Sequence, residues 1–110
     1  MTDHQLDVLA ALAEEIERRK QASPETSYTA KLLSMGVEKC AKKFGEEAVE
    51  LAIASVLRNR AHVSAEAADV LYHLLVLLAA SDVKLKDVTA ELARRQGVSG
   101  IDEKASRPKD

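Results

Sequence analysis

The chain has 110 residues, of which 46% are hydrophobic and 3% aromatic, and 16 basic against 18 acidic side chains give a formal net charge of −2. This balance excludes proteins that bind nucleic acid or anionic lipid through a basic surface, because both need an excess of positive charge. The single cysteine, Cys40, excludes an internal disulfide, and no Cys/His spacing is typical of zinc.

Helix-forming residues dominate the composition. Ala and Leu number 18 and 14, whereas Gly and Pro, which interrupt helices, number 4 and 2. A chain of this length buries only about two-thirds of its unfolded surface by itself. We therefore expect an all-α fold, a helical bundle of four to five helices that is completed by dimerisation.

The first half of the chain predicts two helices. Apolar residues at helical spacing indicate a helix over 3–22 with an inner stripe of Leu6, Leu9, Leu12, Ala13 and Ile16. It should end before Ser23-Pro24, because proline biases the preceding residue away from helix. A polar connector follows, and a short helix is expected over 29–35.

Three further helices are predicted after Gly36, over 37–57, from 61 or 64 to 80, and over 84–96. The turn between the first two should contain Asn59, which tolerates the left-handed backbone that ends helices. The helix that ends at Ala80 is apolar almost all round, which is typical of a buried helix.

A domain over 1–97 followed by a C-terminal tail over 98–110 is the expected organisation, because no linker divides the chain. The longest apolar run, Leu74 to Ala80, is shorter than the roughly 20 residues of a membrane span. The N-terminus, Met1 to His4, does not resemble a signal peptide. We expect a soluble, cytoplasmic protein that binds neither nucleic acid nor membrane.

Two pairs of acidic residues stand three positions apart on successive predicted helices: Glu47 with Glu50, and Glu66 with Asp69. Residues at this spacing share a helix face. If the helices fold back near residue 58, both pairs lie about 12 Å from the turn, and four carboxylates converge. Such a group of oxygen ligands suits Mg²⁺, with Mn²⁺ as the alternative.

The opposing interpretation is a solvent-exposed acidic face, the commoner role of such pairs. Two features argue against it. Glu66, Asp69 and His73 fall within about 60° on an otherwise apolar helix, and an unpaired buried charge is very costly. Lys43 precedes Glu47 by four residues, the poorer order for a helical ion pair. His73 is either a partner of Asp69 or a core histidine. Gly45 either allows close approach by a helix or ligand, or marks a kink.

Three segments carry a family resemblance: Ser27-Tyr-Thr-Ala-Lys-Leu-Leu33, Lys43-Phe-Gly-Glu-Glu-Ala-Val-Glu50 and Glu66-Ala-Ala-Asp-Val-Leu-Tyr-His-Leu-Leu-Val76. With the stretch Gly97 to Arg107 they resemble phosphoribosyl-ATP diphosphatases. Glu-x-x-Glu followed by Glu-x-x-Asp also resembles the wider MazG-type all-α nucleotide pyrophosphohydrolases. Phe44 and Val70 depart from the family's usual residues.

The resemblance implies Mg²⁺-dependent hydrolysis of phosphoribosyl-ATP to phosphoribosyl-AMP and pyrophosphate in a homodimer, the second step of histidine biosynthesis. It implies that Glu46 and Glu47 act in catalysis. The metal ligands that it implies are Glu47, Glu50, Glu66 and Asp69. The triphosphate contacts that it implies are Lys39, Lys42 and Lys43. The cyclohydrolase of the next step is expected on a separate chain.

Two alternative functions remain at this point. One is a MazG-type pyrophosphohydrolase that removes noncanonical nucleoside triphosphates. The other is a non-catalytic helical dimerisation module, which would need no divalent metal and would tolerate loss of the four acids.

Overall fold

The structure, a computed structural model, describes residues 4–97 and 99–108, and these residues form helices without any strand. The elements in chain order are α1 (His4–Arg18), the short 3-10 helix η1 (Arg19–Gln21), α2 (Tyr28–Ser34), α3 (Val37–Val56), α4 (Arg60–Ala80), α5 (Leu85–Arg94) and α6 (Gly100–Ser106). The predicted all-α class is confirmed for the described part of the chain.

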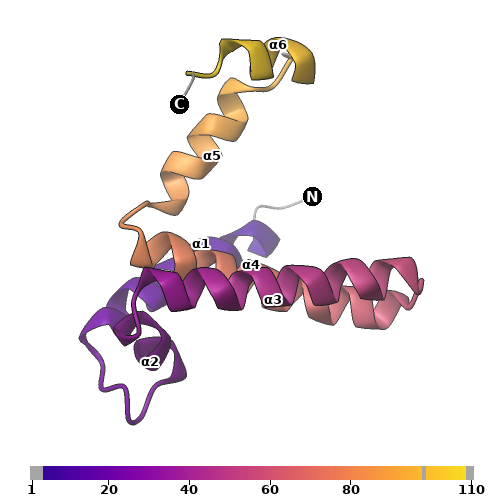
Figure 1. The fold of residues 1–110 in the computed structure, drawn as a ribbon. Coiled ribbons are helices and arrows are strands. Elements are labelled where there is room, and N and C mark those ends of the chain that lie inside the picture. The colour runs from indigo at the N-terminus through magenta and orange to yellow at the C-terminus, as the bar shows by residue number, and fades with distance from the viewer. Residues whose placement is uncertain (1–3, 98, 109–110) are drawn as a thin grey trace.

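Helices α3 and α4 form a long antiparallel hairpin, and α1 and α2 pack on one end of it (Figure 1). The buried core lies at that end and consists of Ile16, Leu32, Cys40, Leu75, Val76 and Ala79. Leu9, Leu12 and Ala13 of the stripe predicted for the first helix pack against it. The side chain of Leu6 lies outside the described residues.

Local sequence explains where α1 and α2 stop and start. The chain leaves η1 before Ser23-Pro24, as predicted, and the hydroxyl of Ser27 then caps α2 by accepting a hydrogen bond from the backbone N–H of Ala30 (3.1 Å). Gly36 has a φ of +91°, a backbone conformation that favours glycine, and it separates α2 from α3.

The turn between α3 and α4 corrects one sequence prediction. The left-handed residue is Arg58, with a φ of 60°, and not Asn59. Asn59 instead has an extended backbone and caps α4, its side chain accepting a hydrogen bond from the N–H of His62 (3.1 Å). Asn is favoured both as the left-handed residue that ends a helix and as the N-cap of the next helix. The sequence alone therefore does not decide which of these roles Asn59 takes.

Helix α4 is buried over its second half only, at His73, Leu75, Val76 and Ala79. A single chain therefore does not bury α4 throughout, because the far half of the hairpin extends beyond α1 and α2. The expectation that dimerisation completes the bundle concerns this uncovered half. Apolar side chains lie bare there, and we call them the hairpin patch: Val49 (59% exposed), Ile53 (55%), Val56 (79%) and Leu57 (72%).

By length and composition, α4 is the one helix in the described residues that could cross a membrane, with a mean hydropathy of 1.6. Core helices of soluble proteins share this property. Helix α4 carries the acids Glu66 and Asp69 in the middle of its length and packs against α1, α2 and α3. Both features are typical of a core helix.

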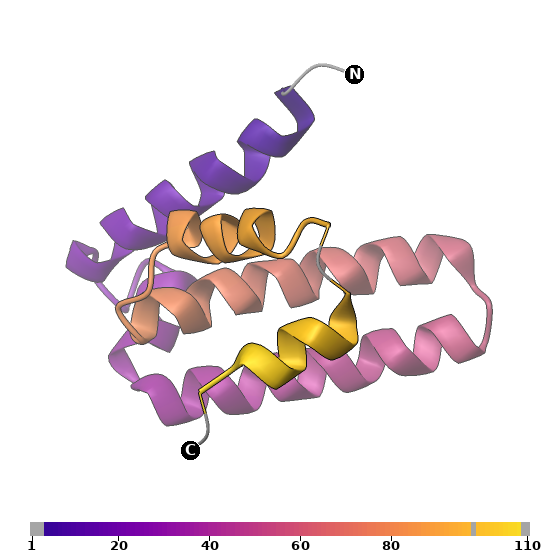
Figure 2. The same cartoon turned by 90° about the horizontal axis from the view of Figure 1, so that it is seen from above.

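The C-terminal part stands off from the hairpin. Figures 1 and 2 show α5 rising from the end of α4 and α6 lying above the hairpin rather than on it. Ion pairs from Lys20 of η1 to Asp82 (3.4 Å) and from Lys84 to Glu17 of α1 (3.8 Å) tie the α4–α5 loop to the first two elements. The expected tail contains the helix α6, which the sequence did not predict, capped by Ser99.

Candidate metal centre

Three carboxylates converge between α3 and α4. One oxygen each of Glu47, Glu66 and Asp69 lies within 4.8 Å of the other two, and we call these residues the acid group. The convergence follows from the hairpin: its turn lies at residues 57–59, so Glu47 on α3 comes level with the Glu66–Asp69 stretch of α4. Separations of this size suit oxygens that share one cation.

Glu50, the fourth predicted ligand, is exposed and lies outside the acid group. It is near enough to act electrostatically on Glu66. The pKa of Glu66 is raised above its ordinary value, first by burial and then by repulsion from Glu50, Asp69 and Glu47. All four acids therefore contribute to one region of negative potential, but only the carboxylates of Glu47, Glu66 and Asp69 converge.

Lys43 is a basic residue that the structure brings to the acid group. Its Nζ lies 3.9 Å from Oε2 of Glu47 and 3.6 Å from Oε1 of Glu46. The side chain of Glu47 is only 14% exposed, so this ammonium offsets part of a carboxylate charge that water solvates poorly.

The remaining residues predicted for the site lie farther round α3. At about 100° per residue, Lys39 lies on the same flank of α3 as Lys43, two turns from Glu47. Lys42 lies about 140° from Glu47 on the helix wheel, and its side chain is exposed. Glu46, about 100° from Glu47, is also exposed and contacts Lys43. The structure therefore separates Lys42 and Glu46 from the convergent carboxylates.

Gly45 shows no close approach within the described structure. A Cβ built there would have nothing within 4 Å, and α3 continues through it as one helix. An open hollow beside it is lined by Lys43, Gly45, Glu46, Glu47, Val49 and Glu50.

His73 supports the acid group from inside the core. Its Nδ1 lies 2.9 Å from the backbone carbonyl oxygen of Asp69, and because a carbonyl only accepts, Nδ1 carries the proton and donates. The ring meets that of Tyr72 edge-on, with centroids 4.9 Å apart. Its Nε2 is buried and has no hydrogen-bond partner in the described residues. His73 is thus a core histidine whose contact with Asp69 is to the backbone and not to the carboxylate.

The contact that joins α2 to the helix of the acid group is not predicted by the sequence. The hydroxyls of Thr29 and Tyr72 hydrogen-bond to each other, and Tyr72 lies one turn after Asp69. No local pattern signals a bond between residues 43 positions apart, so a structure is needed to find it.

Comparison with known proteins places this geometry in a family. A family model described as phosphoribosyl-ATP pyrophosphohydrolase matches residues 9–96. The chain is 63% identical to the phosphoribosyl-ATP pyrophosphatase of Dinoroseobacter shibae over 93% of its own length and 100% of the relative's. It is 66% identical to the enzyme of that name from Paracoccus denitrificans, over 90% and 92% of the two chains. The corresponding protein of Ruegeria pomeroyi is 62% identical over 94% and 99%.

Proposed function

Because the chain belongs to the phosphoribosyl-ATP pyrophosphohydrolase family, we propose that it hydrolyses phosphoribosyl-ATP to phosphoribosyl-AMP and pyrophosphate, the second step of histidine biosynthesis. The observation that carries the proposal is the acid group, Glu47, Glu66 and Asp69, in a chain that matches its relatives over nearly their whole length. A triphosphate is itself strongly anionic, so such a site can receive it only together with cations.

Mg²⁺, with Mn²⁺ as the alternative, is the proposed cofactor, and the donor set fits it. Three carboxylate oxygens within 4.8 Å of one another are hard ligands, and the raised pKa of Glu66 marks a repulsion that a cation would relieve. Glu47, Glu66 and Asp69 would hold the ion, with Glu50 beside them. When bound, it would neutralise phosphate oxygens and lower the pKa of a coordinated water.

The side chains of α3 would divide the remaining work. The ammonium of Lys43, beside Glu47, would hydrogen-bond a phosphate oxygen, and Lys39 would reach the phosphates from the same flank. A carboxylate oxygen of Glu47 or Glu46 would accept a proton from the attacking water. The water oxygen bonds to phosphorus as the phosphoanhydride bond breaks, and pyrophosphate leaves with the bonding electrons. Lys42, on the outer face of α3, has the weakest geometric support.

The chain is a soluble protein, as its biosynthetic relatives indicate, and we propose that it works in the cytoplasm as a homodimer. The bare hairpin patch supports the dimer, because water-exposed apolar groups of this number on one face mark an interface. The cyclohydrolase that consumes phosphoribosyl-AMP is proposed to be a separate chain.

The test is a product assay on the purified protein. Phosphoribosyl-ATP with Mg²⁺ should give phosphoribosyl-AMP and pyrophosphate in equal amounts, and chelation with EDTA should stop the reaction. Faster turnover of dUTP or dCTP than of phosphoribosyl-ATP would contradict the proposal and favour the noncanonical-nucleotide alternative. Undiminished turnover in EDTA would contradict the metal assignment.

A further inference from the structure

We propose that a pocket at the start of α2 receives the phosphoribosyl end of the substrate, with Tyr28 against the base and Lys31 on the ribose phosphate. This inference rests on the proposed function and names the residues that would distinguish phosphoribosyl-ATP from an ordinary nucleoside triphosphate. The pocket measures about 640 Å³ and is lined by Pro24, Glu25, Thr26, Ser27, Tyr28 and Lys31. We call it the α2 pocket.

The substrate's own chemistry requires a second site of this kind. Phosphoribosyl-ATP is anionic at two ends, the triphosphate and the phosphate on the additional ribose, with adenosine between them. The acid group and its lysines can serve only one end. An enzyme that recognises the other end must present a cation and a flat apolar surface at a distance from the acids.

Tyr28 and Lys31 offer those two features side by side. They lie three residues apart on α2, hence on one face of the helix, and both line the pocket. Tyr28 is 56% exposed, and its ring stacks on no other ring among the residues described. Lys31 is exposed and forms no ion pair with any residue that the structure describes. An aromatic face with a nearby free ammonium suits a base that carries a phosphorylated sugar.

The opposite wall of the pocket is ordered before any ligand arrives. The backbone carbonyl of Ser23 accepts hydrogen bonds from the N–H groups of Thr26 (3.2 Å) and Ser27 (3.1 Å). The hydroxyl of Ser23 accepts another from the N–H of Glu25 (3.2 Å). Glu25 is the one carboxylate on the pocket rim, and it can accept hydrogen bonds from ribose hydroxyls. A preformed wall reduces the ordering cost of binding.

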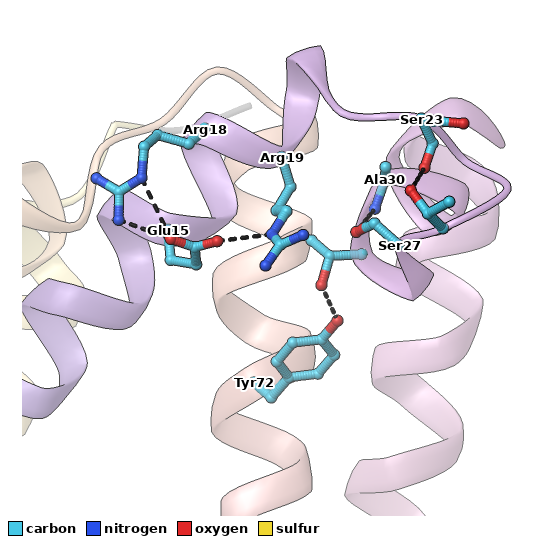
Figure 3. Close-up of polar contacts among 9 residues, drawn as sticks. Glu15, Arg18, Arg19, Ser23, Ser27, Ala30 and Tyr72 are labelled. Carbon is cyan, nitrogen blue, oxygen red and sulfur yellow. Dashed lines mark hydrogen bonds and ion pairs between the residues drawn. The ribbon is translucent and has the colours of Figure 1, made fainter.

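The hydrogen bond between Thr29 and Tyr72 fixes the pocket relative to the acid group. Figure 3 shows Tyr72 reaching from α4 toward the segment that holds Ser27 and Ala30. Burial raises the pKa of Tyr72, and the hydrogen bond with Thr29 opposes part of that increase. Tyr72 follows Asp69 by one helical turn, about 5 Å along the axis, so α2 meets α4 one turn from the acid group.

The test compares Lys31→Gln and Tyr28→Ala with Tyr28→Phe and with a matched surface lysine, Lys86→Gln on α5. With phosphoribosyl-ATP and Mg²⁺, Lys31→Gln should raise KM about tenfold, and Tyr28→Ala about fivefold or more. The kcat values should stay near wild type, because these contacts are made equally in the ground and transition states. Tyr28→Phe keeps the ring and should restore KM, and Lys86→Gln should change nothing.

A binding measurement without turnover separates this inference from the proposed function. In EDTA, calorimetry with phosphoribosyl-AMP should show the same tenfold weakening for Lys31→Gln, whereas AMP, which lacks the second phosphate, should bind wild type and variant alike. Equal binding of phosphoribosyl-AMP by both proteins overturns the inference, even if wild type hydrolyses phosphoribosyl-ATP normally. A change in sedimentation of Tyr28→Ala with unchanged nucleotide binding also overturns it, because the pocket would then belong to a subunit contact.

Discussion

The backbone carbonyl of Asp69 accepts a hydrogen bond from Nδ1 of the buried His73. This bond ties the turn of α4 that presents the exposed Asp69 carboxylate to the core, and Glu66 lies one turn before it. The arrangement favours a built site over a solvent-exposed acidic face.

Removing one charge from the acid group should abolish activity without unfolding the protein. We expect Asp69→Asn and Glu66→Gln to lower kcat/KM by at least about 100-fold, because even the outer partners of metal ligands contribute factors of 10 to 100. In EDTA, their melting temperatures should equal or exceed that of wild type, since repulsion around Glu66 is relieved. Steady-state kinetics and calorimetry measure both effects.

Glu14→Gln on α1, an exposed acid away from the site, is the control and should retain activity. Mg²⁺ should raise the melting temperature of wild type and of this control, because it binds the folded state. Asp69→Asn with wild-type turnover at ordinary Mg²⁺ concentration would remove Asp69 from the site.

The pKa of Glu91 is lowered strongly by the two arginines that follow it at the end of α5. Oε2 lies 2.7 Å from Arg94 Nη2 and 3.0 Å from Arg95 Nε, and these hydrogen bonds lower its pKa from 4.5 to about 2. The lowered pKa means that its contribution to folding is present above pH 4.5 and is lost as the pH falls toward 2.

A carbon-13 NMR titration of the Glu91 carboxyl should therefore show a midpoint near pH 2. Changing both Arg94 and Arg95 to Gln should return the midpoint toward the ordinary value. A wild-type midpoint near that of an unperturbed glutamate would mean that the ion pairs at the end of α5 do not persist in solution.

At the scale of secondary structure, the hairpin turn depends on two adjacent residues with different tasks. Arg58 takes the left-handed conformation and Asn59 caps α4. This division determines how α4 begins and therefore the height at which Glu66 and Asp69 face Glu47. The turn is distant from the acids in sequence, yet it sets their register.

Asn59→Ala should lower the free energy of unfolding by about 1 kcal/mol through loss of the cap. Arg58→Gly should leave stability unchanged or raise it slightly, because glycine adopts a positive φ without strain. Urea denaturation at a fixed protomer concentration measures both. If Asn59 were the left-handed residue, the order would reverse, with Arg58→Gly destabilising and Asn59→Gly neutral.

At the scale of the whole molecule, the core occupies one end of the hairpin and leaves the other end apolar and bare. Exposed apolar side chains gathered on one face are typical of an interface, and the partner that we propose for this face is a second copy of the chain. The hairpin patch lies on α3, the helix that carries Glu47, so assembly would also steady the site.

We expect wild type to sediment as a dimer at micromolar concentration and Ile53→Glu, in the hairpin patch, to sediment as a monomer or to lose folded structure. Ile101→Lys on α6, an apolar side chain that is 83% exposed, is the matched control and should remain dimeric. Circular dichroism separates dissociation from unfolding. A stable folded monomer of wild type would contradict the dimer.

The sequence by itself determined the helical class, the hairpin with its turn near residue 58, and the level match between Glu47 and the stretch from Glu66 to Asp69. These features depend on helical period and chain length, which are local and regular. The capping of α2 at Ser27 follows from the same short-range chemistry.

Only the tertiary structure decided that Glu50 lies outside the acid group, that Thr29 meets Tyr72, and that half of α4 stays uncovered. Glu50 is rotated about 60° from Glu47 around α3, so the relative rotation of two packed helices selects which acids converge. That rotation results from the packing of the whole core. The contact between Thr29 and Tyr72 joins residues 43 positions apart, so no pattern of neighbouring residues predicts it.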